Sequence, residues 1–376
     1  MDKLAVYIHW PYCARICPYC DFNVYKRKND TALLPAILAD LEHWRELSGP
    51  RDVTSIHFGG GTPSLMTAAQ IAAVIETVER LWGFGDIEIA LEANPHEMNA
   101  DIWRDYHAAG LNRMSLGVQS FNDEALAFLG RDHNGGAARK ALDLALEIFP
   151  SVSADLIFGW VGQSQAELDI DLSVLLEAGT PHISTYQLTI EDGTAFARAE
   201  TRGQIRAVSA ELSADFYEYV RTVLTASNLN HYEVSNFAKA GHQSQHNLAY
   251  WHGRDYVGVG PGAHGRLTRD NQRQATITHL TPAAYAKAVT ASGTGIDILE
   301  NLDGPAWAVE YLLMGLRIKE GISLSRYESL SASKLNSSEL RYLIEDKLLI
   351  QEGDRLSATP NGRLVLNAVT ERLLLS

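Results

Sequence analysis

The 376-residue chain is short of cysteine, methionine and positive charge. It has 3 Cys, 5 Met and 32 Lys plus Arg against 46 Asp plus Glu, a net charge of −14. A broad phosphate-binding surface needs clustered cations, so we exclude nucleic acid as a main partner. No apolar run approaches the ~20 residues that a membrane-spanning helix needs. We expect no signal peptide, because a predicted strand begins within a few residues of Met1, and we therefore expect a cytoplasmic globular protein.

The few cysteines are clustered, because Cys13, Cys17 and Cys20 all lie within eight residues. An odd, clustered set in a reducing compartment favours metal or redox chemistry over disulfides. The spacing Cys-x3-Cys-x2-Cys allows one loop to place three thiolates around an iron-sulfur cube, leaving one iron of a [4Fe-4S] cluster open for an exchangeable ligand. A zinc site with His9 as fourth ligand and a set of inert thiols are the alternatives. Structural zinc usually takes two separated ligand pairs, which disfavours zinc here.

Short apolar runs alternate with helical patterns along the first 230 residues. The expected strands cover 4–9, 53–58, 87–91, 113–118, 154–158 and 183–189, and the expected helices cover 33–47, 68–81, 99–109, 122–148, 164–178 and 204–227. Near-continuous apolar strands between helices are typical of a parallel sheet covered by helices. A doubly wound sheet and a full or partial barrel both fit this pattern.

Three segments are predicted along the chain. Residues 1–235 carry the strand-helix alternation, and residues 236–300 form a His-rich connecting segment. Residues 301–376 have helical patterns and a Glu352-Gly353-Asp354 turn between two short strands, which is typical of a small winged helix. This last segment has nine Lys or Arg and ten Asp or Glu. It lacks the basic face that DNA binding requires, so an architectural role is favoured.

Polar residues follow several predicted strands, at the sheet edge where α/β proteins bind ligands. The stretch Gly59-Gly60-Gly61-Thr62 follows the second strand, and its glycines would let a ligand approach exposed backbone N–H groups. A plain tight turn would have the same sequence. Glu92, Gln119 and Asp155 end later strands, where each polar group needs a ligand or a structural hydrogen bond. The Arg131 side chain could bind a carboxylate, or it could be a solvated charge at a helix end.

The cysteine triad after the first strand resembles the radical S-adenosylmethionine (SAM) superfamily. This resemblance implies an α/β fold, a partial (β/α)6 TIM-like barrel with a small C-terminal winged-helix-like α+β domain. It also implies a [4Fe-4S] cluster on Cys13, Cys17 and Cys20 whose open iron binds SAM. The residues that match SAM contacts of the coproporphyrinogen oxidase-like branch are Tyr7, Tyr19, Gly60, Gly61, Thr62, Glu92, Gln119, Arg131 and Asp155.

Two motifs separate enzymes from haem carriers within that branch. The oxygen-independent coproporphyrinogen III oxidases have a fourth cysteine where this chain has Phe22, and Cys-Pro-Tyr-Cys-Asp-Phe is similar to the HemW-type haem chaperones. The sequence from His246 to Trp251 matches their haem-associated His-Asn-x-x-Tyr-Trp motif. Five of the 13 histidines lie between His231 and His264. The resemblance thus implies that His246 helps to bind haem, with a buried structural motif as the alternative.

The resemblance also implies partners. It implies haem as cargo, haem-acceptor proteins as recipients and an electron donor for the cluster. It leaves open whether SAM is cleaved, whether haem is attached covalently, whether the protein associates peripherally with a membrane, and whether it is a monomer or a homodimer. Coproporphyrinogen III oxidation by a deoxyadenosyl radical and a zinc-stabilised interaction protein stay as alternative functions.

Overall fold

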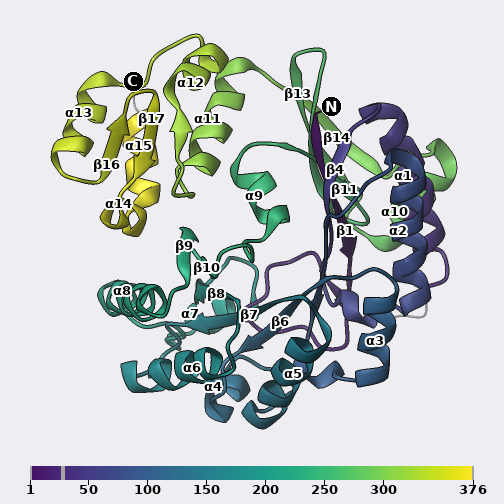
Figure 1. Cartoon of the computed structure of the whole chain (residues 1–376), viewed down its shortest axis with the longest axis horizontal. Coiled ribbons are helices and arrows are strands. Elements are labelled where there is room, and N and C mark those ends of the chain that lie inside the picture. Colours follow the sequence, from purple (N-terminus) through teal and green to yellow (C-terminus); the bar gives the residue numbers. More distant parts are fainter. Residues whose placement is uncertain (1, 27–29, 375–376) are drawn as a thin grey trace.

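The computed structural model describes residues 2–26 and 30–374, and its main feature is one curved sheet of 12 strands (Figure 1). The first six strands of the strand-helix alternation pair in parallel: β1 (Lys3–Trp10), β4 (Asp52–Gly60), β5 (Glu88–Ala93), β6 (Arg113–Gln119), β7 (Ser151–Phe158) and β8 (His182–Gln187). Their apolar residues are buried on both faces, as the neighbouring residues Ala5 and Val6 of β1 show. The predicted parallel α/β fold is confirmed.

Helices cover the outer side of this curved sheet (Figure 1). They are α1 (Leu33–Ser48), α2 (Ala68–Trp82), α3 (Ala100–Ala108), α4 (Asp123–Phe128), α5 (Gly135–Ile148), α6 (Gln165–Glu177), α7 (Ala195–Glu200) and α8 (Ala210–Ala226). Local sequence fixes several helix starts: Thr67 and Gln70 form a reciprocal capping box at α2. Trp44 of α1 and Trp103 of α3 are fully buried in the main core. Among the described residues, no helix has both the length and the apolar character to cross a membrane.

Two predicted helices differ from the structure. The single helix expected at 122–148 is divided into α4 and α5, because Gly130 adopts a left-handed conformation with φ +68°. A Cβ atom at Gly130 would lie 2.6 Å from Cδ of Pro18 in the cysteine-bearing loop, so this break allows the two segments to pack closely. The helix expected from residue 204 begins only at Ala210, where the Ser209 side chain caps its first turn.

The segment 236–300 contains more regular structure than the sequence analysis predicted. The elements after α8 are β9 (Asn230–Glu233), β10 (Asn236–Ala238), α9 (Gln245–Trp251), β11 (Asp255–Val259), β12 (His264–Arg269), β13 (Gln272–Thr278), α10 (Pro282–Ser292) and β14 (Ile296–Leu302). Strand β11 pairs in parallel with β1, and β12 to β14 continue the same sheet as antiparallel strands. Polar side chains are frequent in these strands, which is why no apolar pattern marked them.

The C-terminal residues form a separate small unit, visible at the upper left of Figure 1. It contains α11 (Gly304–Gly315), β15 (Ile322–Ser323), α12 (Leu324–Ser331), α13 (Ser337–Glu345), β16 (Leu349–Glu352), β17 (Arg355–Ala358), α14 (Pro360–Leu364) and α15 (Leu366–Leu374). The three strands pair in the order β15-β17-β16 with antiparallel neighbours. Leu312, Leu343 and Leu356 belong to a hydrophobic core of this unit. The winged-helix-like α+β domain is confirmed.

Candidate functional site

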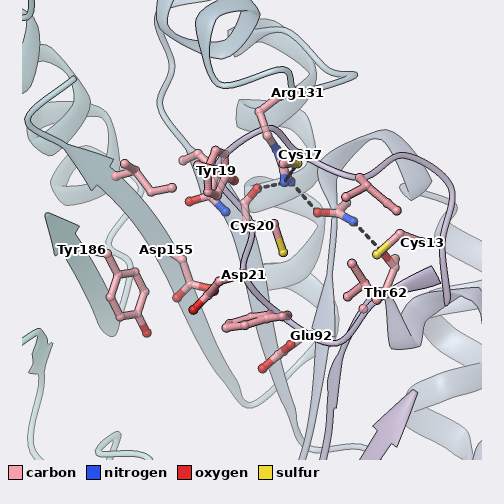
Figure 2. A pocket seen from close by; sticks show the side chains of 18 of the residues that line it. Cys13, Cys17, Tyr19, Cys20, Asp21, Thr62, Glu92, Arg131, Asp155 and Tyr186 are labelled. Atoms are coloured by element: carbon pink, nitrogen blue, oxygen red, sulfur yellow. Dashed lines mark hydrogen bonds between the residues drawn. The ribbon is translucent and has the colours of Figure 1, made fainter. Parts of the chain in front are cut away.

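The three cysteines lie on a loop, residues 11–24, at the carboxyl end of β1. Strand β2 (Tyr12–Cys13) pairs with β3 (Tyr25–Lys26) and closes this cysteine loop at its base. The thiols of Cys13, Cys17 and Cys20 face one cavity of about 420 Å³, which we call the cluster cavity (Figure 2). The fold therefore places the thiols of all three clustered cysteines around one cavity.

Eight of the nine predicted SAM residues line the same cluster cavity: Tyr19, Gly60, Gly61, Thr62, Glu92, Gln119, Arg131 and Asp155. They meet there because the parallel strands β4 to β7 all end at this edge of the sheet. The ninth, Tyr7, lines an adjoining cavity of about 560 Å³, which we call the second cavity. Its hydroxyl lies 3.1 Å from Nδ1 of His9.

Arg131 holds the cysteine loop against the strand ends. Its Nη1 donates a hydrogen bond to Sγ of Cys17 at 3.3 Å, and its Nη2 donates to the Gly117 carbonyl at 3.0 Å and to Oδ1 of Asn94. Asn94 in turn donates to Thr62 at 3.2 Å, so one chain of hydrogen bonds crosses the cavity wall (Figure 2). Arg131 is thus a partner of a thiol in this structure, not a solvated charge.

The glycines after β4 serve the cysteine loop. Gly61 N–H donates to the Trp10 carbonyl at 2.7 Å, and Thr62 N–H donates to the Tyr12 carbonyl at 2.8 Å. The expectation that this stretch exposes its N–H groups to a ligand is wrong for these two amides, because loop carbonyls already accept them. A Cβ atom at Gly61 would lie 2.8 Å from the Tyr12 carbonyl oxygen. Glycine is needed there so that the loop can approach β4.

This close approach gives a testable prediction for Gly61→Ala. The added methyl group meets backbone atoms of the cysteine loop, so the loop must shift, at a cost of about 1–3 kcal/mol. We expect lower iron and sulfide content after anaerobic reconstitution. Gly85→Ala is the matched control, because a Cβ atom at Gly85 has no neighbour within 4 Å among the described residues. Equal cluster content in the two variants would show that the loop does not depend on Gly61.

Asp155 on β7 is a partly buried carboxylate that lines the cluster cavity. Ser115 donates a hydrogen bond to its Oδ2 at 3.2 Å. Burial, together with the charge of Glu92, raises the pKa of Asp155 to about 6, against hydrogen bonds from Ser184 and Ser115 that lower it. A carboxyl group with this pKa changes its charge in the weakly acidic range, where it can switch between donating and accepting a hydrogen bond.

The raised pKa of Asp155 predicts how stability depends on pH. Between pH 4 and 6 the folded protein keeps a proton on Asp155 that the unfolded chain releases near its ordinary pKa of 3.8, so stability rises as pH falls. Relative to Asp155→Asn, we expect the wild type to gain about 1 kcal/mol from pH 7 to pH 5. Urea denaturation at the two pH values measures this. Asp143→Asn, at an exposed carboxylate, is the control, and an identical pH dependence in wild type and Asp155→Asn would contradict the prediction.

The donor set fits an iron-sulfur cluster. Burial raises the pKa of the Cys13 thiol, against a hydrogen bond with Thr62 that lowers it. Burial raises the pKa of the Cys20 thiol to about 11. Thiols in such surroundings ionise when a cation compensates them, and coordinated iron does so. Soft thiolates around one cavity, with the Arg131 cation beside Cys17, suit this kind of group.

The zinc alternative required His9 beside the cysteines. Instead, Nδ1 of His9 lies 3.1 Å from the Tyr7 hydroxyl and Nε2 lies 3.0 Å from the Asn23 carbonyl. Within residues 2–26 and 30–374, no group of three or more His, Cys, Asp or Glu side chains is arranged to hold a single metal ion. His9 therefore fastens the cysteine loop to β1 in this structure.

His246 lies outside both cavities, on α9. Its side chain is 1% exposed, its Nδ1 lies 2.9 Å from the Ser55 hydroxyl, and its Nε2 lies 2.7 Å from the Tyr250 hydroxyl. Its ring stacks on His57 with the centroids 4.8 Å apart. Both ring nitrogens are therefore occupied, which matches the buried structural motif that the sequence analysis gave as the alternative to haem binding.

Several residues of the cluster cavity were not predicted from the sequence. Asn94, Tyr186 and Gln187 line it, and Phe22 lies at its boundary with the second cavity. Tyr186 and Gln187 are polar residues at the end of β8, the same signal that identified Glu92 and Asp155. Asn94 follows β5 directly. Phe22 is large and apolar but 61% exposed, and it lines both cavities.

Comparisons with known proteins agree over the whole chain. The family model "Radical SAM superfamily" matches residues 7–203, and the "HemN C-terminal domain" model matches residues 303–365. A protein of Haemophilus influenzae named "Heme chaperone HemW" is 35% identical, covering 100% of this chain and 98% of its own. A Bos taurus protein named "Radical S-adenosyl methionine domain-containing protein 1, mitochondrial" is 37% identical, covering 99% and 88%.

One solved structure is similar over nearly all of the chain. The coproporphyrinogen III oxidase HemN from Escherichia coli superposes with a TM-score of 0.82 and covers 99% of this chain and 90% of its own. Its sequence is 22% identical, so this likeness concerns the fold. It shows that the barrel and the C-terminal domain are arranged as in that enzyme.

Proposed function

The chain belongs to the radical SAM superfamily and, within it, to the family of the haem chaperone HemW, and from this premise we propose that it is a haem chaperone. It binds a [4Fe-4S] cluster, SAM and haem, and it passes haem to acceptor proteins. The observation that carries this proposal is full-length similarity to proteins named as haem chaperones. Phe22 supports it, because coproporphyrinogen III oxidases resemble this chain but have a fourth cysteine at that position.

The cluster cavity has the residues for the first two ligands. Cys13, Cys17 and Cys20 would hold the cluster through thiolates, and their shared cavity supports this assignment. Cluster and SAM, when bound, supply one-electron reductive chemistry. Glu92 and Asp155 face the same cavity and would accept hydrogen bonds from hydroxyl or amine groups of SAM. Arg131 would keep its cation beside Cys17.

The proposal includes the organisation and surroundings of the protein. Residues 1–235 form the radical SAM barrel, 236–300 a connecting segment with the His246 motif, and 301–376 the winged-helix-like domain. The strands β11 to β14 attach the connecting segment to the barrel sheet. We place the protein in the cytoplasm, with haem-acceptor proteins and an electron donor as partners. Monomer and homodimer both fit it.

Haem titration of the purified protein tests this function. We expect saturable binding of about one haem per chain, seen as an absorbance band that develops to an endpoint, and transfer of that haem to an apo-haem protein added afterwards. Under anaerobic conditions the reconstituted protein should not convert coproporphyrinogen III. A protein that binds no haem, or one that decarboxylates coproporphyrinogen III with cleavage of SAM, would overturn the proposal and favour the oxidase alternative.

A further inference from the structure

The second cavity has the size of a ligand site, and its wall combines aromatic and apolar side chains with a few charged ones. Its volume of about 560 Å³ lies within the usual range of ligand pockets. Aromatic and apolar side chains provide much of its wall, namely Phe22, Tyr250, Trp251, Tyr256, Leu280 and Met314. Phe22, Asp21, Gly60 and Glu92 belong to the cluster cavity as well, so the two cavities adjoin. Tyr250 and Trp251 of the haem-associated motif line this space, whereas His246 does not.

Two histidines line this cavity, His9 and His264, and His246 contacts its wall through Tyr250; the three differ in their free nitrogens. Both ring nitrogens of His9 are in hydrogen bonds, and so are both ring nitrogens of His246. His264, the first residue of β12, lines the cavity and is exposed. Within the described parts of the chain its ring makes no hydrogen bond and no ion pair. His264 is therefore the histidine of this wall whose imidazole nitrogens are free for a ligand.

We propose that haem binds in the second cavity and that His264 ligates its iron. This inference rests on the proposed haem-chaperone function and adds to it the place and the ligand. Imidazole nitrogen is a common axial ligand of haem iron, and aromatic side chains pack well on a flat macrocycle. The strand β12 carries His264 in the same sheet as β1, so the ligand is held on a rigid element.

His246 has a different role in this arrangement. Its Nε2 lies 2.7 Å from the Tyr250 hydroxyl, and Tyr250 lines the second cavity. The Tyr250 ring also packs edge-on against Tyr256, with the centroids 4.5 Å apart. His246 therefore acts as a positioning residue, because it orients the aromatic wall through Tyr250 while its own ring stays buried.

Haem titration of three full-length variants tests the proposal. For His264→Ala we expect at least ~10-fold weaker haem binding and loss of the absorbance and electron paramagnetic resonance signature of imidazole-ligated iron. For His246→Ala we expect weaker binding with that signature retained. His107→Ala, at an exposed histidine of α3, is the control and should match the wild type. Far-UV circular dichroism confirms that each variant is folded.

Chemical rescue makes the test independent of folding. Added imidazole should restore the ligated signature in His264→Gly, because it can occupy the space of the lost ring. A wild-type signature in His264→Ala, or no recovery of His264→Gly with imidazole, would overturn the assignment of His264. Absence of haem binding by the wild-type protein would instead overturn the proposed function, so the two failures are distinguishable.

Discussion

Replacing Cys17 with serine is expected to leave the reconstituted protein without its iron-sulfur cluster. The cysteine loop provides three thiols, which is the smallest protein ligand set for a cube that keeps one iron open. Serine oxygen is a harder and less easily ionised donor than thiolate, so the remaining two thiolates would not retain the cluster. Cys17 also accepts the hydrogen bond from Arg131, so its loss leaves that cation without a thiolate partner.

Iron and sulfide analysis after anaerobic reconstitution measures this effect. We expect a fall from about four irons per chain to near zero, with loss of the visible absorbance of the cluster. Tyr186→Phe is the control, since Tyr186 lines the same cavity without a thiol and should retain the wild-type iron content. A Cys17→Ser protein that still holds four irons and four sulfides would show that the cluster has a different ligand set.

The parallel strands of the barrel were predictable because their burial requires apolar residues, which are visible in the sequence of each strand. A parallel strand that is buried on both faces is mostly apolar, and β1 shows this most clearly in the run of residues 4–8. Strands β13 and β14 have polar or exposed side chains at most positions, so only their pairing within the sheet reveals them. The break between α4 and α5 likewise depends on Pro18, which lies far from Gly130 in the sequence.

In the candidate site, too, some features depend on local sequence and others depend on contacts between distant parts of the chain. Carboxyl ends of parallel strands meet at one edge, so Glu92, Gln119 and Asp155 could be placed together from their strand-end positions. The state of a histidine ring could not be predicted, because it depends on distant partners. Nδ1 of His246 contacts the hydroxyl of Ser55, 191 positions away in the sequence. The motif gives no sign of this contact, which occupies a nitrogen that could otherwise bind iron.

Replacing Arg273 with methionine should cause the largest loss of stability among the single-charge changes considered. Its side chain is 2% exposed and joins three elements. On β13, its Nη1 lies 3.1 Å from Asp255 of β11, and its Nε lies 3.2 Å from Glu310 of α11. Methionine keeps the length of the side chain but removes the charge. Asp255 and Glu310 then lose a buried partner, which typically costs about 3–5 kcal/mol.

Urea denaturation of the apo protein measures the cost of Arg273→Met. Arg139→Met is the matched control, because Arg139 pairs with Asp143 at 3.0 Å on an exposed helix face, where such a pair contributes about 0.3–0.5 kcal/mol. Since Glu310 belongs to the first helix of the C-terminal unit, we also expect Arg273→Met to weaken the attachment of that unit to the barrel and to increase its proteolysis. A stability within ~1 kcal/mol of the wild type would mean that the remaining partners compensate the two carboxylates, namely Arg51, 3.3 Å from Asp255, and Arg266, 2.6 Å from Glu310.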